Sequence, residues 1–314
     1  MPPASERGRR RRGLARVALT LLLAGATACG GGPGITPIRT PFNRGVYHHS
    51  RGELDAAIAE YRDALDEDPD DVRARFNLAS AYDERGQALR NSGKADAARA
   101  EFAAAEREYR RVLERDPDNV RAAVNLAALE HERGERDAAR RRLQAAIDAH
   151  DDLALPRTAL ALRLLEAGEL DAARGQLEAA LRREPMDLGA NVLLGQILAR
   201  QERHDEARQA YRTALRREPN DPGALLGLAR VEAATGRAGE AATLVDQALL
   251  VDRRNLDAHL LAAEMHEQAG ALEDAVFHYW QARALDQGKP PRADYREHLR
   301  VLYARLLDGV TRIR

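Results

Sequence analysis

The residues of this sequence that could do chemistry are few and widely spaced. His131 stands between two glutamates, but the second histidine of a helical zinc-protease motif is missing. His259 and His266 are seven residues apart and would share a helical face near His278. A metal would need all three at about 2 Å, which spacing alone does not provide, so we interpret them as packing or surface residues.

Other catalytic patterns are also missing from the sequence. No glycine-rich loop precedes a Walker-type lysine, and no serine or cysteine lies in a nucleophile elbow. The repeats described below leave no long stretch for a separate catalytic domain. The sequence therefore predicts that the chain is not an enzyme, with no catalytic residue, no metal, no cofactor and no small-molecule substrate.

The single cysteine, Cys29, excludes a disulfide within one chain. Six arginines lie in the first 28 residues, and an apolar run over 14–28 ends directly before Cys29. A basic segment, a short apolar segment and small residues before a cleavage point are typical of a secretory signal. The run is shorter than the roughly 20 apolar residues of a membrane-spanning helix.

Ala26-Thr27-Ala28-Cys29 resembles a bacterial lipobox, with Ala26 where that family usually has leucine. The resemblance implies a lipoprotein signal peptide over 1–28, acylation of Cys29, and a flexible tether over 29–37. Gly30 replaces the aspartate that retains such lipoproteins at the inner membrane, which favours the outer membrane, facing the periplasm. The alternative is ordinary signal cleavage, which leaves a soluble periplasmic protein.

Composition favours helices and disfavours one class of partner. Of 314 residues, 44% are hydrophobic, 32% charged and only 4% aromatic, a balance typical of helical proteins. Beyond residue 28 the chain has 43 basic and 49 acidic residues, a net charge of -6. A nucleic-acid-binding protein usually keeps a basic balance, so no nucleic-acid partner is expected.

An internal repeat occupies most of the chain. Gly134, Gly168, Gly236 and Gly270 lie on a 34-residue grid with Glu202 at its one other place, and an alanine follows each position by five residues. This period and pattern resemble the tetratricopeptide repeat (TPR). The resemblance implies an all-α solenoid, a right-handed superhelix of about seven helix pairs whose stacked faces form one continuous core.

The repeat units are predicted over 38–71, 72–119, 120–153, 154–187, 188–221, 222–255 and 256–289, followed by a capping helix over 290–314. The second unit, 72–119, exceeds the 34-residue repeat by 14 residues. Either the turn lies at 91–94 and both helices are longer by about two turns, or the turn stays at Gly86 and the extra residues form a loop. The insertion is either merely tolerated or a docking projection.

The first helices of the first three units carry a repeated pair of polar residues, four positions apart. These peptide-groove candidates are Arg39, Asn43, Arg73, Asn77, Arg121 and Asn125. Residues at this spacing share a helical face, so stacked units would form one ladder of arginine and one of asparagine. In peptide-binding TPR proteins, groove asparagines hold backbone amides and basic groups hold carboxylates, which implies extended peptide segments or acidic tails as partners.

The ladder stops after the third unit, so we expect a polar, basic groove near the lipid and a more apolar one further along. The alternative interpretation is that the arginines are merely solvated and the asparagines suit the turns between repeats. Together these features predict a non-enzymatic scaffold or adaptor that supports assembly of a pilus, secretion, outer-membrane or wall-building complex. A self-associating spacer and a regulatory subunit of an envelope enzyme are the alternatives.

Overall fold

The computed structural model describes residues 40–286 and 295–312, and within these ranges it contains helices and no strand. Cys29, the signal segment, the tether and Arg39 lie outside the described residues. The described chain divides into two compact units, and the division falls after Arg163, inside helix α9 (Ala154–Ala167). We call residues 40–163 the N-terminal unit and the described residues from 164 onward the C-terminal unit.

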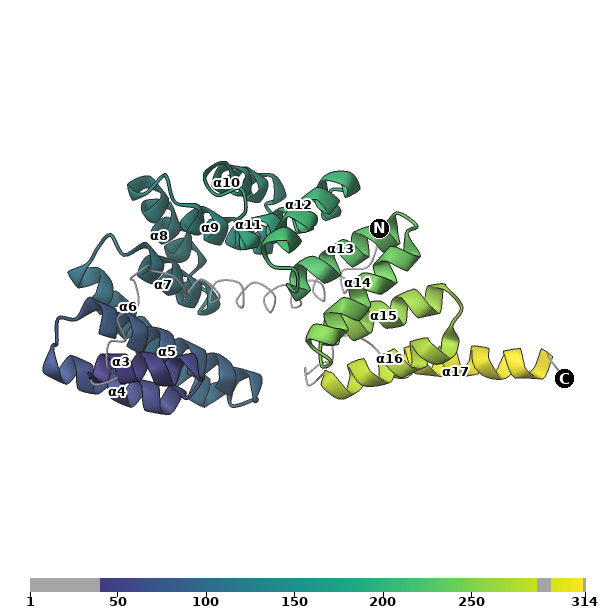
Figure 1. Cartoon of the computed structure of the whole chain (residues 1–314), viewed down its shortest axis with the longest axis horizontal. Coiled ribbons are helices and arrows are strands. Elements are labelled where there is room, and N and C mark those ends of the chain that lie inside the picture. Colours follow the sequence, from purple (N-terminus) through teal and green to yellow (C-terminus); the bar gives the residue numbers. More distant parts are fainter. Residues whose placement is uncertain (1–39, 287–294, 313–314) are drawn as a thin grey trace. The chain divides into compact units, whose positions relative to one another are not determined.

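The N-terminal unit is a stack of antiparallel helix pairs, and each helix packs against the next (Figure 1). Its helices are α3 (Pro41–Ser50), α4 (Leu54–Glu67), α5 (Val72–Asn91), α6 (Ala95–Arg115), α7 (Val120–Glu132) and α8 (Arg136–Ala149). The first helix of a pair is called helix A and the second helix B. Tyr61 and Tyr109 from B helices and Leu78 and Leu126 from A helices form a buried core.

The C-terminal unit continues the same alternation. It contains α10 (Leu170–Arg183), α11 (Leu188–Arg200), α12 (His204–Arg217), α13 (Pro222–Ala234), α14 (Ala238–Val251), α15 (Leu256–Gln268), α16 (Leu272–Leu285) and α17 (Tyr295–Arg312). Helix α17 packs against α16 and buries Tyr295, Leu299 and Leu302, which covers apolar surface that the last helix pair would otherwise expose.

Local sequence signals set the ends of these helices. Asp71, Asn119, Asp187, Asp221 and Asn255 precede the A helices, and the side chain of each accepts a hydrogen bond from a backbone amide of the first turn. The turns inside the pairs require left-handed backbone, which glycine adopts without strain. Among the described residues, Glu202 (φ 60°) is the only residue other than glycine with this conformation.

The long second pair has its turn at Ser92–Lys94, the first of the two alternatives. Helix α5 has 20 residues against 13 in α7, and α6 has 21 against 14 in α8. Gly86 lies inside α5 against the ring of Phe102; a Cβ atom there would lie 2.6 Å from Cε1 of that ring. The insertion is therefore a packed extension of both helices. No described helix has the length and apolar character needed to cross a bilayer.

Candidate functional site

The A helices of the N-terminal unit carry an arginine–phenylalanine arrangement across successive pairs. The guanidinium carbon of Arg73 lies 5.2 Å from the ring centre of Phe42, and that of Arg121 lies 5.5 Å from the ring centre of Phe76. The side chain of Arg73 is 78% exposed. Stacking on a ring face leaves the edge of a guanidinium, where its N–H groups point, open to a ligand.

We call the surface formed by Phe42, Arg73, Asn77, Arg121 and Asn125 the A-face. The structure brings four of the six predicted groove residues, from α5 and α7, onto it. Arg39 is outside the described residues, and Asn43 lies on α3, where its side-chain amide forms no hydrogen bond with the described part of the chain. The arginines of the A-face thus extend outward, while its asparagines also face the core of the stack.

Asn125 of the A-face bonds to a core tyrosine of the preceding helix B, and Asn77 faces the corresponding tyrosine, Tyr61. Asn125 donates from Nδ2 to the Tyr109 hydroxyl over 2.9 Å, and the amide of Asn77 lowers the pKa of Tyr61 against the larger effect of burial. Burial raises the pKa of both tyrosines, so they are neutral at physiological pH and need polar partners. The Asn125 bond therefore ties α7 to the preceding α6, and only part of that amide is available to a ligand.

The same A helices are acidic at their other ends, which the sequence interpretation missed. Glu84 follows Asn77 by about two turns and shares its side of α5, and Asp83 directly precedes Glu84. His49 Nε2 lies 3.0 Å from Glu84 Oε1, and its Nδ1 lies 3.3 Å from the Tyr61 hydroxyl. Burial, reinforced by the nearby carboxylates of Glu132 and Glu84, raises the pKa of Asp83 to about 6. The sequence predicts a polar, basic groove in these repeats; the A-face carries arginines at one end and the carboxylates of Asp83 and Glu84 toward the other.

In the C-terminal unit the matching position is taken by glycine. Gly227 occupies the place in its repeat that Asn125 has in the third, and Tyr211 corresponds to Tyr109. A Cβ atom at Gly227 would lie 2.3 Å from Cε1 of Tyr211, and one at Gly195 would lie 2.8 Å from the same atom. The Tyr211 ring thus fills the space between two glycines, with no amide present to bond its hydroxyl.

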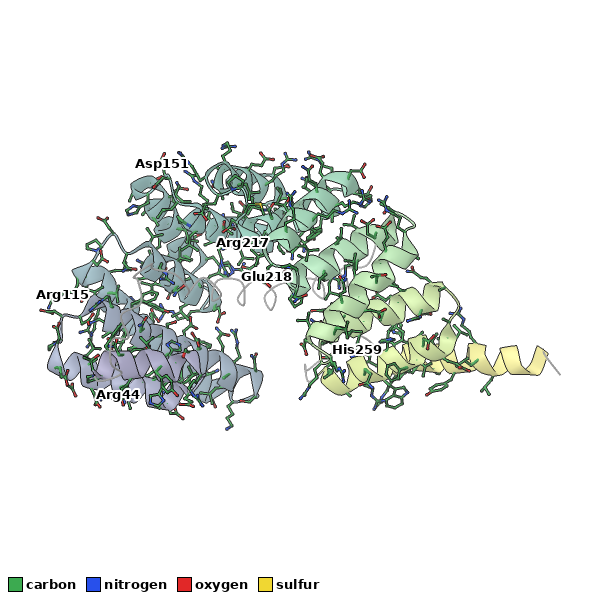
Figure 2. The ribbon with its side chains drawn as sticks, in the orientation of Figure 1. Arg44, Arg115, Asp151, Arg217, Glu218 and His259 are labelled. Carbon is green, nitrogen blue, oxygen red and sulfur yellow. The ribbon has the colours of Figure 1, made fainter. Side chains whose placement is uncertain are left out.

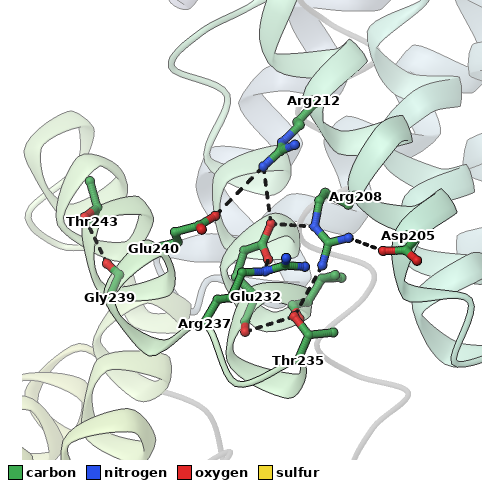
Figure 3. Close-up of polar contacts among 10 residues, drawn as sticks. Asp205, Arg208, Arg212, Glu232, Thr235, Arg237, Gly239, Glu240 and Thr243 are labelled. Atoms are coloured by element: carbon green, nitrogen blue, oxygen red, sulfur yellow. Dashed lines mark hydrogen bonds and ion pairs between the residues drawn. The ribbon is translucent and has the colours of Figure 1, made fainter.

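The C-terminal unit also holds a buried charge cluster that the sequence interpretation did not identify (Figure 3). Glu232 is fully buried and accepts hydrogen bonds from Arg208 Nε at 2.8 Å and from Arg237 Nε at 2.6 Å. Arg212 Nη2 lies 3.7 Å from the same carboxylate. The cluster joins α12, α13 and the turn after α13, so it is a structural ion-pair network.

The three C-terminal histidines do come together. His259, which Figure 2 labels on α15, has Nδ1 3.0 Å from Nδ1 of His278, and the ring of His266 stacks on that of His278 at 5.4 Å. Because His259 Nε2 bonds to the Arg253 carbonyl at 3.1 Å, His259 carries its proton there and accepts at Nδ1. Within the described residues, no group of three His, Cys, Asp or Glu side chains has the arrangement of a metal site.

Comparison of the chain with protein families identifies the repeat. Residues 158–222 and 198–265 match two family models described as tetratricopeptide repeat, and residues 47–86 match a third, described as TPR repeat. The chain is a tetratricopeptide-repeat solenoid. TPR repeats indicate a protein-interaction scaffold, and the fold is typically non-enzymatic. No curated protein matches the sequence.

Solved structures resemble this TPR chain in fold. A TPR protein from Parabacteroides merdae has a TM-score of 0.58 at 15% identity, over 84% of this chain and 97% of that one. PilF of Pseudomonas aeruginosa has 0.55 at 18% identity, over 74% and 99%. A chain of the APC/C hetero-tetramer Cut9-Hcn1 has 0.61 at 14% identity, over 93% of this chain but only 59% of its own length. These identities support a common fold and no shared activity.

Proposed function

We propose that this TPR chain is a non-enzymatic adaptor that holds an extended segment of a partner protein along the A-face of its N-terminal unit. The observation that carries the proposal is the pair of arginines, Arg73 and Arg121, stacked in the same way on Phe42 and Phe76. A guanidinium held on a ring loses less side-chain entropy when it binds a carboxylate, and two in register can bind one extended chain at two points.

We further propose that Cys29 is acylated and anchors the chain in the bacterial envelope, at the outer membrane facing the periplasm. Support comes from the arginine-rich start, the apolar run over 14–28 and the small residues before Cys29. Several acyl chains bind a bilayer firmly because each buried methylene contributes about 0.8 kcal/mol. There the scaffold would support assembly of a pilus, secretion, outer-membrane or wall-building complex.

Affinity purification from detergent-solubilised membranes of the native host, with mass spectrometry, tests the partner proposal. The double variant Arg73→Ala/Arg121→Ala should lose a partner that the wild type retains. The control Arg136→Ala/Arg141→Ala removes two exposed arginines from α8 of the same unit, and it should retain the partner. Equal loss in both variants would contradict an A-face site. Asn125 is a poorer test position because it also supports the core tyrosine Tyr109.

Cell fractionation tests the anchor separately. Cys29→Ser should move the protein from the membrane to the soluble periplasmic fraction, and metabolic labelling with a palmitate analogue should mark only the wild type. Unchanged membrane retention of Cys29→Ser would contradict lipid anchoring and leave the partner test unaffected.

A self-associating spacer is the second candidate, favoured by exposed aromatic residues near the C-terminus. Trp280 on α16 is 46% exposed, donates from Nε1 to the Tyr303 hydroxyl on α17 at 3.1 Å, and lies near exposed Phe277. Exposed aromatic clusters are common at protein contacts. Purification that returns only the chain itself, together with a dimer in sedimentation analysis that Trp280→Ala dissociates, would favour this candidate over the adaptor.

A further inference from the structure

A charged cleft lies on the other side of α5 from the A-face. Helices α4 and α6 form its walls and α5 its floor, where Leu78 and Tyr82 are buried, and its volume is about 390 Å³. Arg75 lines this cleft, while Arg73 lies on the A-face. Side chains two positions apart on a helix point in directions that differ by about 200°. The cleft is therefore a surface separate from the proposed A-face site.

Arginines dominate the charge of this cleft. Four of them line it, against two carboxylates, so its formal charge is +2. One carboxylate, Glu108, already binds two of the arginines: Arg75 Nη1 at 2.9 Å and Arg111 Nη1 at 3.0 Å. Glu108 is therefore already paired and does not neutralise the other two arginines of the cleft.

The remaining two arginines, Arg62 on α4 and Arg107 on α6, have no carboxylate partner. Arg62 donates from Nη2 at 2.6 Å and Nε at 3.0 Å to the hydroxyl of Tyr82, a neutral acceptor. Arg107 makes no hydrogen bond or ion pair with any described residue. Two uncompensated guanidiniums thus stand on opposite walls of one cleft.

Elsewhere the chain supplies a carboxylate for arginines in comparable positions between helices. Glu130 accepts three hydrogen bonds from Arg142, and Glu232 accepts from Arg208 and Arg237. The second carboxylate of the cleft, Asp66 on α4, forms no ion pair with Arg62 or Arg107 in the described part of the chain, so a carboxylate from another molecule would complete the pattern.

We infer that this cleft binds an acidic segment of a partner protein, with side-chain carboxylates bonded to Arg62 and Arg107. A segment with several carboxylates can reach both walls at once, whereas a single small anion satisfies one guanidinium at a time. The inference does not rest on the A-face, because it involves none of the same side chains.

Fluorescence anisotropy of a labelled poly-glutamate peptide with the full-length protein tests the inference. Binding should weaken about tenfold or more in Arg62→Ala/Arg107→Ala, because both charge-assisted contacts are lost. The control Arg136→Ala/Arg141→Ala removes the same charge from exposed α8 and should change binding less than about twofold.

Circular dichroism and thermal melting verify that the cleft variant is folded, and Arg62→Lys/Arg107→Lys, which keeps the charge, should recover part of the binding. The inference is wrong if wild-type protein does not bind poly-glutamate, or if the cleft and control variants weaken binding equally. It is also wrong if phosphatidylglycerol vesicles bind through Arg62 and Arg107 while the peptide does not, since the ligand is then a lipid headgroup. Either failure leaves the A-face test with Arg73 and Arg121 standing.

Discussion

The side-chain amide of Asn125 donates a hydrogen bond to the hydroxyl of Tyr109 over 2.9 Å, and this bond ties α7 to the preceding α6. Because Tyr109 is fully buried, its hydroxyl cannot exchange that partner for water. Asn125→Ala should therefore lower the free energy of unfolding by about 1–2 kcal/mol, measured by urea denaturation followed by circular dichroism.

Asn43→Ala is the matched control, since Asn43 has the same place in the first repeat but its amide bonds to no described residue. Its effect on unfolding should stay within about 0.5 kcal/mol. Equal destabilisation by the two variants would mean that the tyrosine bond contributes nothing specific.

At Gly227, helix α13 packs directly against the ring of Tyr211 from α12. A Cβ atom there would lie 2.3 Å from Cε1 of Tyr211, whose ring is 2% exposed and cannot move away into solvent. Gly227→Ala should destabilise the C-terminal unit by about 1–3 kcal/mol through overpacking, and Tyr211→Leu in the same chain should recover part of that loss.

Gly175→Ala provides the opposite expectation in the same unit. Gly175 lies on the exposed side of α10, and a Cβ atom there meets nothing within 4 Å. The substitution should stabilise the helix by roughly 0.4–1 kcal/mol because alanine restricts the unfolded chain, and thermal melting should show the increase. A stability gain for Gly227→Ala as well would show that the Tyr211 contact is loose.

These contacts mark the limit of what the sequence predicts. The 34-residue glycine grid fixed the repeat family, and the spacing placed Arg73 and Asn77 on one side of a helix. Spacing defines a face but not its neighbours, so it could not show that Tyr109 bonds Asn125 or that Phe42 supports Arg73. Those partners come from the preceding repeat and depend on how the pairs stack.

The acidic end of the A-face was open to sequence reasoning but was missed. Asp83 and Glu84 stand six and seven residues after Asn77 and lie well inside the lengthened helix A of this repeat, whose turn is at Ser92–Lys94. With the alternative turn at Gly86 they would have stood at the end of the helix. The lengthened helices therefore give this repeat a longer polar face, which the 34-residue pattern does not contain.

The buried carboxylate of Glu232 should be the most sensitive charged group of the C-terminal unit. Glu232→Gln leaves Arg208 and Arg237 without their counter-charge in a buried place, which should cost about 3–5 kcal/mol of stability. Asp205→Asn removes a partner of Arg208 that is 95% exposed, and should cost at most about 1 kcal/mol. The free energy of unfolding of both variants, measured by denaturant at neutral pH, tests this prediction. Similar small losses in the two variants would mean that the cluster is well solvated.

Asp83 should make the N-terminal unit more stable in mild acid. Its pKa is raised from 3.8 to about 6, so between these values the folded chain binds more protons than the unfolded chain. The stability that Asp83 contributes is therefore fully present below pH 3.8, and it is lost as the pH rises through 6. Asp83→Asn should increase stability at pH 7 and have little effect near pH 4; an equal gain at both pH values would contradict the raised pKa.

His278 should give the C-terminal unit the opposite dependence. Burial, together with the neighbouring His259 and His266 and against the opposing charges of Asp274 and Asp246, lowers its pKa from 6.5 to about 4. The unfolded chain therefore binds more protons between these values, so stability is fully present above pH 6.5 and is lost as the pH falls toward 4. The loss should amount to about 1–2 kcal/mol, because the ring is only half-buried and solvent screens part of the effect. His278→Gln should remove this dependence in thermal melts between pH 4 and 7, whereas His48→Gln, in the other unit, should leave it unchanged. If His278→Gln keeps the wild-type slope, the bond between His259 and His278 does not control the acid sensitivity of α15 and α16.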